Sequence, residues 1–299
     1  MASSPSWLQS LFSPANNRWT ALFINSLSER LRKYGFSSDC VLAEVKDTEP
    51  SVKSLREVEK IIGYNFNNQS LLQEALTHIS CKKNSGSYER LEYVGDAVIN
   101  LMITKQLFST YPNLPTGQLS PLRAANVDKE KLARAAVKHN LHKYLRHTQP
   151  LLKKQAQAFI NTVPKYPLHS YGMIDVPKFL SDIVESTVGA VFVDSDSSID
   201  TTWKVAKGLL DPIITSEMLE KNPVQKLNEI CQKHKLQVHV KDLWLHEGAF
   251  EVYLNNQLFG RGKYRLRKEI AMNRAAHDAY HNIVMSLGVK DSSNGGANC

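Results

Sequence analysis

The chain has 299 residues, a formal net charge of +8 and a sequence pI near 9.2, which suits about two domains and favours an anionic partner. Its four cysteines, Cys40, Cys81, Cys231 and Cys299, are scattered without CxxC spacing, which argues against a zinc site or a disulfide framework and indicates a reducing compartment. No apolar run approaches the roughly 18 to 20 residues that span a bilayer, so we expect a soluble protein with no membrane partner.

Residues 1–50 form a leader of uncertain structure. This segment is rich in serine and has no acidic residue before Glu29, which resembles an organelle transit peptide. The alternative is a variable leader, and apolar residues at roughly helical spacing indicate that part of it packs on the body of the protein.

The stretch 51–217 predicts an all-helical domain. Apolar residues recur there with a helical period, first at Leu55, Val58, Ile61 and Ile62 and then at 71–76. No strand is expected in this part.

Within this domain the run 89–96 carries three acids. In a helix Glu89, Glu92 and Asp96 are spaced i, i+3 and i+7, which places them on one side. The apolar residues Leu91, Val94, Val98 and Leu101 interleave with them, so we expect a largely buried helix.

A second acidic pair, Asp182 and Glu185, stands in an otherwise apolar stretch. Burying carboxylates beside one another is costly unless a cation neutralises them. The two segments therefore favour a hard divalent ion, magnesium or manganese, held between two helices. From spacing alone, a solvated helix face or salt bridges would also explain these acids.

A composition shift near residue 222 marks a second domain, 221–288, followed by a flexible tail, 289–299. Residues 221–290 hold 12 Lys plus Arg and 6 Asp plus Glu. We expect an amphipathic helix from 222, strands at 237–244, 250–254 and 258–264, and a final helix at 266–287. Asn255 and Asn256 are expected to form the turn between the last two strands. One face of the final helix carries Ala271, Ala275, Ala276, Ala279 and Ile283.

The run YERLEYVGDAVINL resembles the signature of the ribonuclease III family. The similarity continues upstream in IGYNF and LLQEALTH, and downstream in LSPLRAANVDKEKLARAA and PKFLSDIVESTVGAVFVDSD. The α-β-β-β-α order of the second domain resembles a double-stranded RNA-binding domain. The resemblance implies an α+β protein: an all-helical ribonuclease III endonuclease domain followed by a small RNA-binding domain, as in the plant-type branch.

The resemblance also implies residue roles. Glu92, Asp96, Asp182 and Glu185 match the catalytic positions, with Asp96 and Glu185 closest to the chemistry and all four at the metal, while Glu89 matches a further acid of the cleft. The implied cofactor is Mg²⁺, with Mn²⁺ as a substitute. The implied reaction is metal-dependent hydrolysis of double-stranded RNA to 5′-phosphate and 3′-hydroxyl ends, in RNA processing or small-RNA pathways.

In the second domain the positions implied to meet RNA are Gln225, Asn228 and Glu229 on the first helix, and Lys263, Arg265, Arg267, Lys268 and Arg274 around the start of the last one. Two positions depart from the family's basic pattern, because Glu269 and Met272 stand where lysines are usual. An ordinary polar helix face is the alternative for the first group.

One set of acids per chain cannot cut both strands, so the resemblance implies a homodimer through the signature helix, with Tyr93, Val94 and Ile99 as contributors. The competing hypothesis is a non-catalytic double-stranded RNA-binding accessory protein, and the presence of all four acids argues against it. We expect localisation in the nucleus, the cytoplasm or both, or in a plastid or mitochondrion if residues 1–50 are a transit peptide.

The stretch 149–177 holds four prolines and several basic and aromatic residues, and resembles insertions of the plant-type branch. It is expected either to touch the nucleic acid or to be a surface loop without a role.

Overall fold

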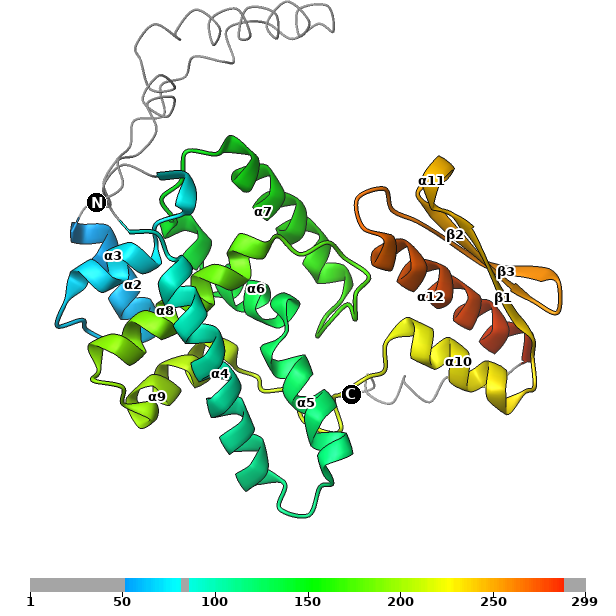
Figure 1. The fold of residues 1–299 in the computed structure, drawn as a ribbon, viewed down its shortest axis with the longest axis horizontal. Coiled ribbons are helices and arrows are strands. Elements are labelled where there is room, and N and C mark those ends of the chain that lie inside the picture. Colours follow the sequence, from blue (N-terminus) through cyan, green and yellow to red (C-terminus); the bar gives the residue numbers. More distant parts are fainter. Residues whose placement is uncertain (1–51, 82–85, 288–299) are drawn as a thin grey trace, which may run out of the picture. The chain divides into compact units, whose positions relative to one another are not determined.

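A computed structural model describes residues 52–81 and 86–287 (Figure 1). Up to residue 210 every regular element described is a helix, apart from an isolated β-bridge between Thr77 and Arg146. The elements are α2 (Val52–Ile62), α3 (Gln69–Ala75), η4 (Ile79–Cys81), α4 (Glu89–Thr110), α5 (Thr116–Val127), α6 (Lys129–Lys138), η5 (Leu141–Tyr144), α7 (Pro150–Thr162), η6 (Val163–Lys165), α8 (Lys178–Asp194) and α9 (Ile199–Leu210). The all-helical prediction is confirmed. The leader, with its transit-peptide hypothesis, and the tail lie outside the described residues.

Local capping explains where several helices begin. The side chain of Asn68 accepts a hydrogen bond from Ser70 N at the start of α3, and Ser198 accepts one from Thr201 N at the start of α9. Asp128 accepts from both Glu130 N and Lys131 N and so caps α6. Each cap satisfies backbone N–H groups that have no partner within the helix.

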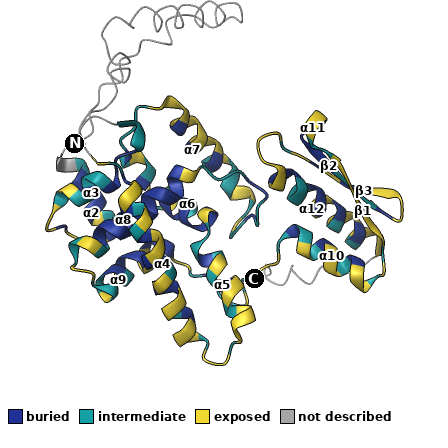
Figure 2. Ribbon diagram, viewed as in Figure 1, coloured by how far each residue is buried: buried dark blue, intermediate teal, exposed yellow. Residues whose placement is uncertain are grey.

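Helix α8 is the centre of the helical part. It packs against α3, α4, α6 and α9, and every residue from Phe179 to Val191 is buried (Figure 2). A helix that is apolar on all sides belongs in a domain interior. Asp182 and Glu185 are therefore charged groups in an otherwise apolar setting.

The crossing of α4 and α8 depends on two glycines. A Cβ atom on Gly95 would lie 1.8 Å from the carbonyl oxygen of Glu185, and one on Gly189 would lie 2.1 Å from that of Leu91. No side chain fits at either point, so the two backbones touch. The acids of the two helices flank this contact.

The segment 149–177 is only partly a loop, which corrects the sequence-based interpretation. Residues 150–162 form α7, with Pro150 in its first turn, where the missing N–H costs nothing. Leu152, Ala156 and Phe159 are buried on the helical core. The irregular part runs from 166 to 177.

The second group of elements contains the predicted three-stranded sheet. Its strands β1 (Val238–Leu243), β2 (Ala249–Leu254) and β3 (Gln257–Lys263) are antiparallel and adjacent in chain order. Asn255 and Asn256 both have positive φ, 46° and 66°, as a tight two-residue hairpin turn requires. A short helix that was not predicted, α11 (Trp244–Glu247), follows β1.

Two helices complete this part: α10 (Pro223–Lys233) and α12 (Lys268–Leu287). They pack together, and α12 also packs on β2 and β3. A Cβ atom on Gly262 would lie 2.1 Å from the carbonyl oxygen of Ala271, so α12 lies directly against β3. The predicted apolar face of this helix, from Ala271 to Ile283, is buried.

Helix α4 is less buried than the sequence suggested. Leu101 is 55% exposed, so the expected burial is wrong for that residue. Ile99 is 1% exposed and belongs to the core, so it does not contribute to a dimer surface. Tyr93, in contrast, is 81% exposed.

No helix in the described part of the chain combines the length and the apolar character that crossing a bilayer requires.

The α4–α8 contact predicts that Gly95→Ala will be strongly destabilising. The added methyl group meets backbone, which cannot rotate away, so we expect a loss of about 3 kcal/mol or more in the free energy of unfolding. Gly208→Ala in α9 is the matched control, because its Cβ meets nothing within 4 Å. That control should gain about 0.5 to 1 kcal/mol. Urea denaturation measures both, and equal stabilities of the two variants would contradict the contact.

Candidate active site and nucleic-acid interface

Three acids from the two crossing helices meet in one place. Ligand oxygens of Glu92 on α4 and of Asp182 and Glu185 on α8 all lie within 4.8 Å of one another. Asp182 is 3% exposed and Glu185 is 9% exposed. Hard carboxylate oxygens at this separation are the donor set that a divalent ion of the magnesium type prefers.

The electrostatics of the cluster are unfavourable without a cation. Burial raises the pKa of Glu185 to about 7, and the charges on Asp182, Asp96 and Glu92 add to the rise. Lys178 offsets part of this effect. A buried acid whose charged form is disfavoured by burial and by specific neighbouring charges is a candidate functional residue.

Lys178 places a positive charge between two of the acids. Its ammonium lies 2.5 Å from Glu92 Oε1 and 2.8 Å from Asp182 Oδ1. Burial lowers the pKa of Lys178, but its hydrogen bonds to Asp182 and Glu92 outweigh burial and raise the pKa above the ordinary value. The ammonium bridges two of the oxygens that would hold a metal ion, so the carboxylates fit a cation.

Asp182 is also held from the other side by Tyr88. The buried Tyr88 hydroxyl donates to Asp182 Oδ2 at 3.0 Å, across 94 residues of sequence. Burial first, and then the charge on Asp182, raises the pKa of the Tyr88 phenol, which therefore remains a donor. Sequence reasoning missed both Tyr88 and Lys178. The only signals available were the place of Tyr88 at the head of the acidic run and the i, i+4 spacing of Lys178 and Asp182.

The other two predicted acids are not part of the trio. Asp96 is exposed and accepts a hydrogen bond from Asn100 Nδ2 at 3.0 Å, yet it is near enough to raise the pKa of Glu185. Arg123 of α5 in turn donates to Asn100 Oδ1 at 2.9 Å. Glu89 is exposed and accepts from Ser87 Oγ at 2.9 Å. The structure thus brings three acids together, with Asp96 beside them and Glu89 outside the trio.

The residues expected to meet RNA fall into two groups. Gln225, Asn228 and Glu229 are exposed on α10, and Glu229 forms an ion pair with Lys221 at 2.6 Å. Lys263 and Arg265 are exposed near the end of β3. All five side chains reach solvent.

The remaining three basic residues are engaged. The Lys268 ammonium lies 2.7 Å from Asp242 Oδ2 and over the Phe250 ring. Arg267 Nε lies 2.8 Å from Asp175 Oδ1. Arg274 Nε donates to the Met173 carbonyl at 3.1 Å.

The two departures from the basic pattern differ in kind. Glu269 is exposed in the first turn of α12. Met272 is half-buried and packs against the apolar core of the small domain. Position 272 therefore contributes to packing in this chain. The Met272 thioether fills an apolar gap, whereas the charged end of a lysine would have to extend out of that gap into solvent.

Comparison with known proteins identifies two families in the chain. The ribonuclease III domain model matches residues 89–196, and the double-stranded RNA binding motif matches residues 223–283. Ribonuclease 3-like protein 3 of Oryza sativa subsp. japonica is 46% identical over 235 residues, which cover 77% of this chain and 79% of that protein. The chain belongs to the ribonuclease III family.

Other relatives share parts of the chain. Ribonuclease 3-like protein 2 of Arabidopsis thaliana is 38% identical over 268 residues, covering 87% of this chain and 65% of that protein. The solved nuclease domain of ribonuclease III from Campylobacter jejuni is 30% identical and covers 53% of this chain and 97% of that one, with a TM-score of 0.42. As a family member the chain is a double-stranded RNA endoribonuclease with the nuclease domain first and the RNA-binding motif second.

The raised pKa of Glu185 predicts that Glu185→Gln will stabilise the metal-free ribonuclease. An acid whose folded-state pKa lies above its unfolded value of 4.5 costs stability as the pH rises from 4.5 through about 7. Glutamine mimics the protonated form, so we expect a gain on the order of 1 to 2 kcal/mol at pH 8. The gain should shrink steadily as the pH is lowered toward 4.5.

Thermal unfolding in EDTA across this pH range measures the effect. Glu57→Gln, at an exposed position on α2, is the control for loss of one negative charge. A gain for Glu185→Gln that does not depend on pH would rule out the proposed electrostatic cause.

Proposed function

We propose that the protein hydrolyses phosphodiester bonds of double-stranded RNA with Mg²⁺, or Mn²⁺ as a substitute, and leaves 5′-phosphate and 3′-hydroxyl ends. Its place in the cell would be RNA processing or a small-RNA pathway. The observation that carries the proposal is the trio of Glu92, Asp182 and Glu185, whose oxygens lie within 4.8 Å of one another at a buried helix crossing.

Each acid has a role that follows from its position. Glu92, Asp182 and Glu185 would hold divalent metal, and Tyr88 fixes Asp182 by its hydrogen bond. Asp96, exposed beside Glu185, would orient the attacking water from the solvent side. When bound, the divalent ions supply activation of the water and stabilisation of the leaving 3′-oxygen.

Lys178 would leave its bridging position when the acids take up a divalent ion. Its side chain is 57% exposed, so the ammonium is free to turn outward while its stem stays in place. The residue then keeps a positive charge beside the cleft, where a phosphate backbone has to approach.

The roles of the acids predict that Glu185→Gln and Asp96→Asn will abolish cleavage and leave duplex binding intact. Binding depends on basic residues elsewhere in the chain, whereas the two variants alter only the chemistry. We expect cleavage of a labelled RNA duplex in Mg²⁺ to fall at least about 100-fold. The Kd of the duplex, measured by fluorescence anisotropy in EDTA, should change less than about twofold.

Glu57→Gln serves as the control and should cleave normally. Loss of binding together with cleavage in a folded variant would contradict the division of roles, as would undiminished cleavage in EDTA.

The proposed active form is a homodimer through α4. Tyr93, Leu101 and Phe108 are 81%, 55% and 73% exposed, and with the exposed Ala97 and Thr104 they form a mostly apolar stripe along one side of the helix. A stripe at i, i+4, i+8, i+11 and i+15 suits pairing with an identical helix about a twofold axis. Two copies bring two sets of acids, one for each strand.

We expect Leu101→Glu to convert the dimer into monomers, because the substitution places charge in the middle of the apolar stripe. Leu245→Glu is the matched control, since Leu245 is 91% exposed on α11 and lies outside the stripe. Equilibrium sedimentation at micromolar concentration should give a monomer for the first variant and a dimer for the second.

Mixing wild-type and Glu185→Gln chains should yield a species that nicks one strand. A wild-type monomer that still cuts both strands would end the dimer model.

A further inference from the structure

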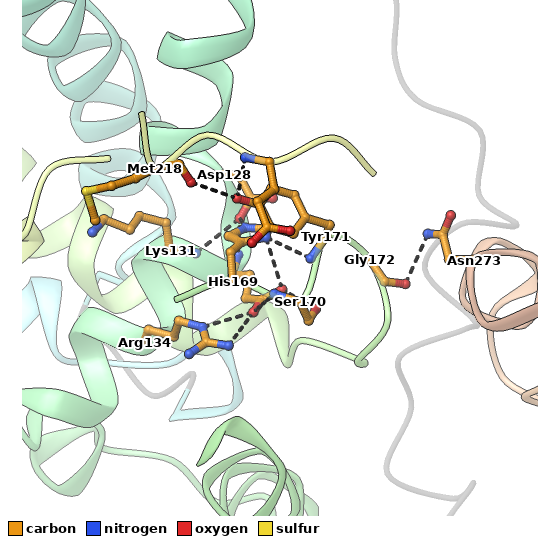
Figure 3. Close-up of polar contacts among 11 residues, drawn as sticks. Asp128, Lys131, Arg134, His169, Ser170, Tyr171, Gly172, Met218 and Asn273 are labelled. Carbon is orange, nitrogen blue, oxygen red and sulfur yellow. Dashed lines mark hydrogen bonds and ion pairs between the residues drawn. The ribbon is translucent and has the colours of Figure 1, made fainter. Parts of the chain in front are cut away.

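The loop 166–177 is built into the nuclease domain by buried polar groups. Ser170 donates from its backbone N to Glu130 Oε1 at 2.8 Å and from its hydroxyl to Glu130 Oε2 at 2.5 Å. Arg134 holds the same carboxylate through Nε and Nη2, at 2.9 and 2.7 Å (Figure 3). Because Glu130 is 3% exposed and fully partnered, the loop has a defined conformation.

A histidine adds a second anchor. His169 Nε2 lies 3.1 Å from Asp128 Oδ1, and its Nδ1 accepts from Tyr171 N at 2.8 Å. The Tyr171 hydroxyl in turn accepts from Glu220 N at 3.0 Å and donates to the Met218 carbonyl at 3.5 Å (Figure 3). The loop therefore also holds the chain that leads into α10.

The far side of the loop contacts α12 and the residues just before it. Asn273 Nδ2 donates to the Gly172 carbonyl at 3.1 Å (Figure 3). The Tyr264 hydroxyl donates to Asp175 Oδ2 at 2.9 Å, and Arg267 pairs with the other oxygen of that carboxylate. Burial, followed by the hydrogen bond to Asp175, raises the pKa of Tyr264 to about 12, so this donor keeps its proton.

These contacts occupy two of the basic groups that the sequence predicts to bind RNA. Arg267 and Arg274 were both expected to meet phosphate, and here they face the Asp175 carboxylate and the Met173 carbonyl. A carboxylate and a phosphate present similar acceptor oxygens to a guanidinium, so the two compete for it.

The same contacts lie at the acid cleft. One cleft is lined by Tyr88, Lys178 and Asp182 together with Tyr264, Arg267 and Arg274. Asp175 belongs to this lining as well and stands three residues before Lys178. With the loop contacts formed, part of the wall of the cleft is made by the RNA-binding domain itself.

We propose that the loop 166–177 is an autoinhibitory latch, in which Asp175 holds the start of α12 against the acid cleft until duplex RNA displaces it. The proposal rests on the proposed function, since it takes double-stranded RNA as the competing ligand. One partly exposed ion pair and a few hydrogen bonds hold the latch, which makes it weak enough for a polyanion to open.

The test compares Asp175→Asn with Asp200→Asn in the full chain. Asp200 also forms an ion pair, with Lys105 at 3.4 Å, and lies outside the latch, so its variant removes the same charge. We expect Asp175→Asn to tighten duplex binding about three- to tenfold in EDTA, because the binding-competent population rises. Asp200→Asn should bind within about twofold of wild type.

A second measurement needs no RNA. Small-angle scattering should give a larger radius of gyration for Asp175→Asn than for wild type, and the Asp200→Asn control should match wild type. Tyr264→Phe, which removes one latch hydrogen bond and keeps the ring beneath Arg274, should shift both readouts in the same direction by a smaller amount.

The outcomes separate the two proposals. Unchanged or weaker binding by Asp175→Asn overturns the latch, as does an unchanged radius of gyration in both latch variants. If no variant, nor wild type, binds duplex RNA, the proposed function fails and the gating role of the latch fails with it. Binding by wild type without tightening in Asp175→Asn leaves the function standing and removes only the latch.

Discussion

The close backbone contact between α4 and α8 is the constraint on which the site depends. Gly95 and Gly189 contribute no chemistry, but each allows the opposing carbonyl to come within a distance that any side chain would forbid. Because the two backbones touch at this crossing, the short side chains of Glu92, Asp182 and Glu185 reach one another. Together with the packing of α3, α6 and α9 around α8, the same contact buries that helix and so removes its two acids from water. Helix packing therefore sets both the geometry and the electrostatics of the cluster.

Holding these acids close together is electrostatically unfavourable, and a few neighbouring residues partly compensate for it. Burial first, and then the like charges of the neighbouring acids, disfavour the ionised form of Glu185 and raise its pKa to about 7. Lys178 supplies the compensating charge and Tyr88 a neutral donor, so that Asp182 is fixed without a further cation. The site is therefore less stable than an apolar crossing of the same shape would be, as is usual where function requires charges to be held close together.

Sequence patterns predicted the features that depend on residues close together in the chain. Helical periodicity predicted the helical domain, and the Asn255–Asn256 pair predicted the hairpin turn. The alanine face predicted which side of α12 is buried. Spacing and resemblance together selected the acids. What failed depended on partners distant in sequence: the Tyr88–Asp182 bond spans 94 residues, and no local pattern distinguishes the buried Ile99 from the exposed Tyr93. Met272 fits a basic pattern poorly in the sequence, and only its contact with the small core gives the reason.

The loop 166–177 shows why an insertion resists interpretation from sequence. Its prolines at 167 and 177 indicate a surface segment. However, Ser170 and His169 form hydrogen bonds with Glu130 in α6 and with Asp128, the N-cap of that helix. A buried carboxylate with four donors is costly to disturb, so the loop is a rigid platform on one side. On its other side the contacts with Arg267 and Tyr264 are partly exposed and individually weak. A segment that is strongly held by one domain and weakly bound to the next can release the second without unfolding the first. In the proposed latch, that asymmetry would allow an RNA duplex to compete for the same guanidinium groups.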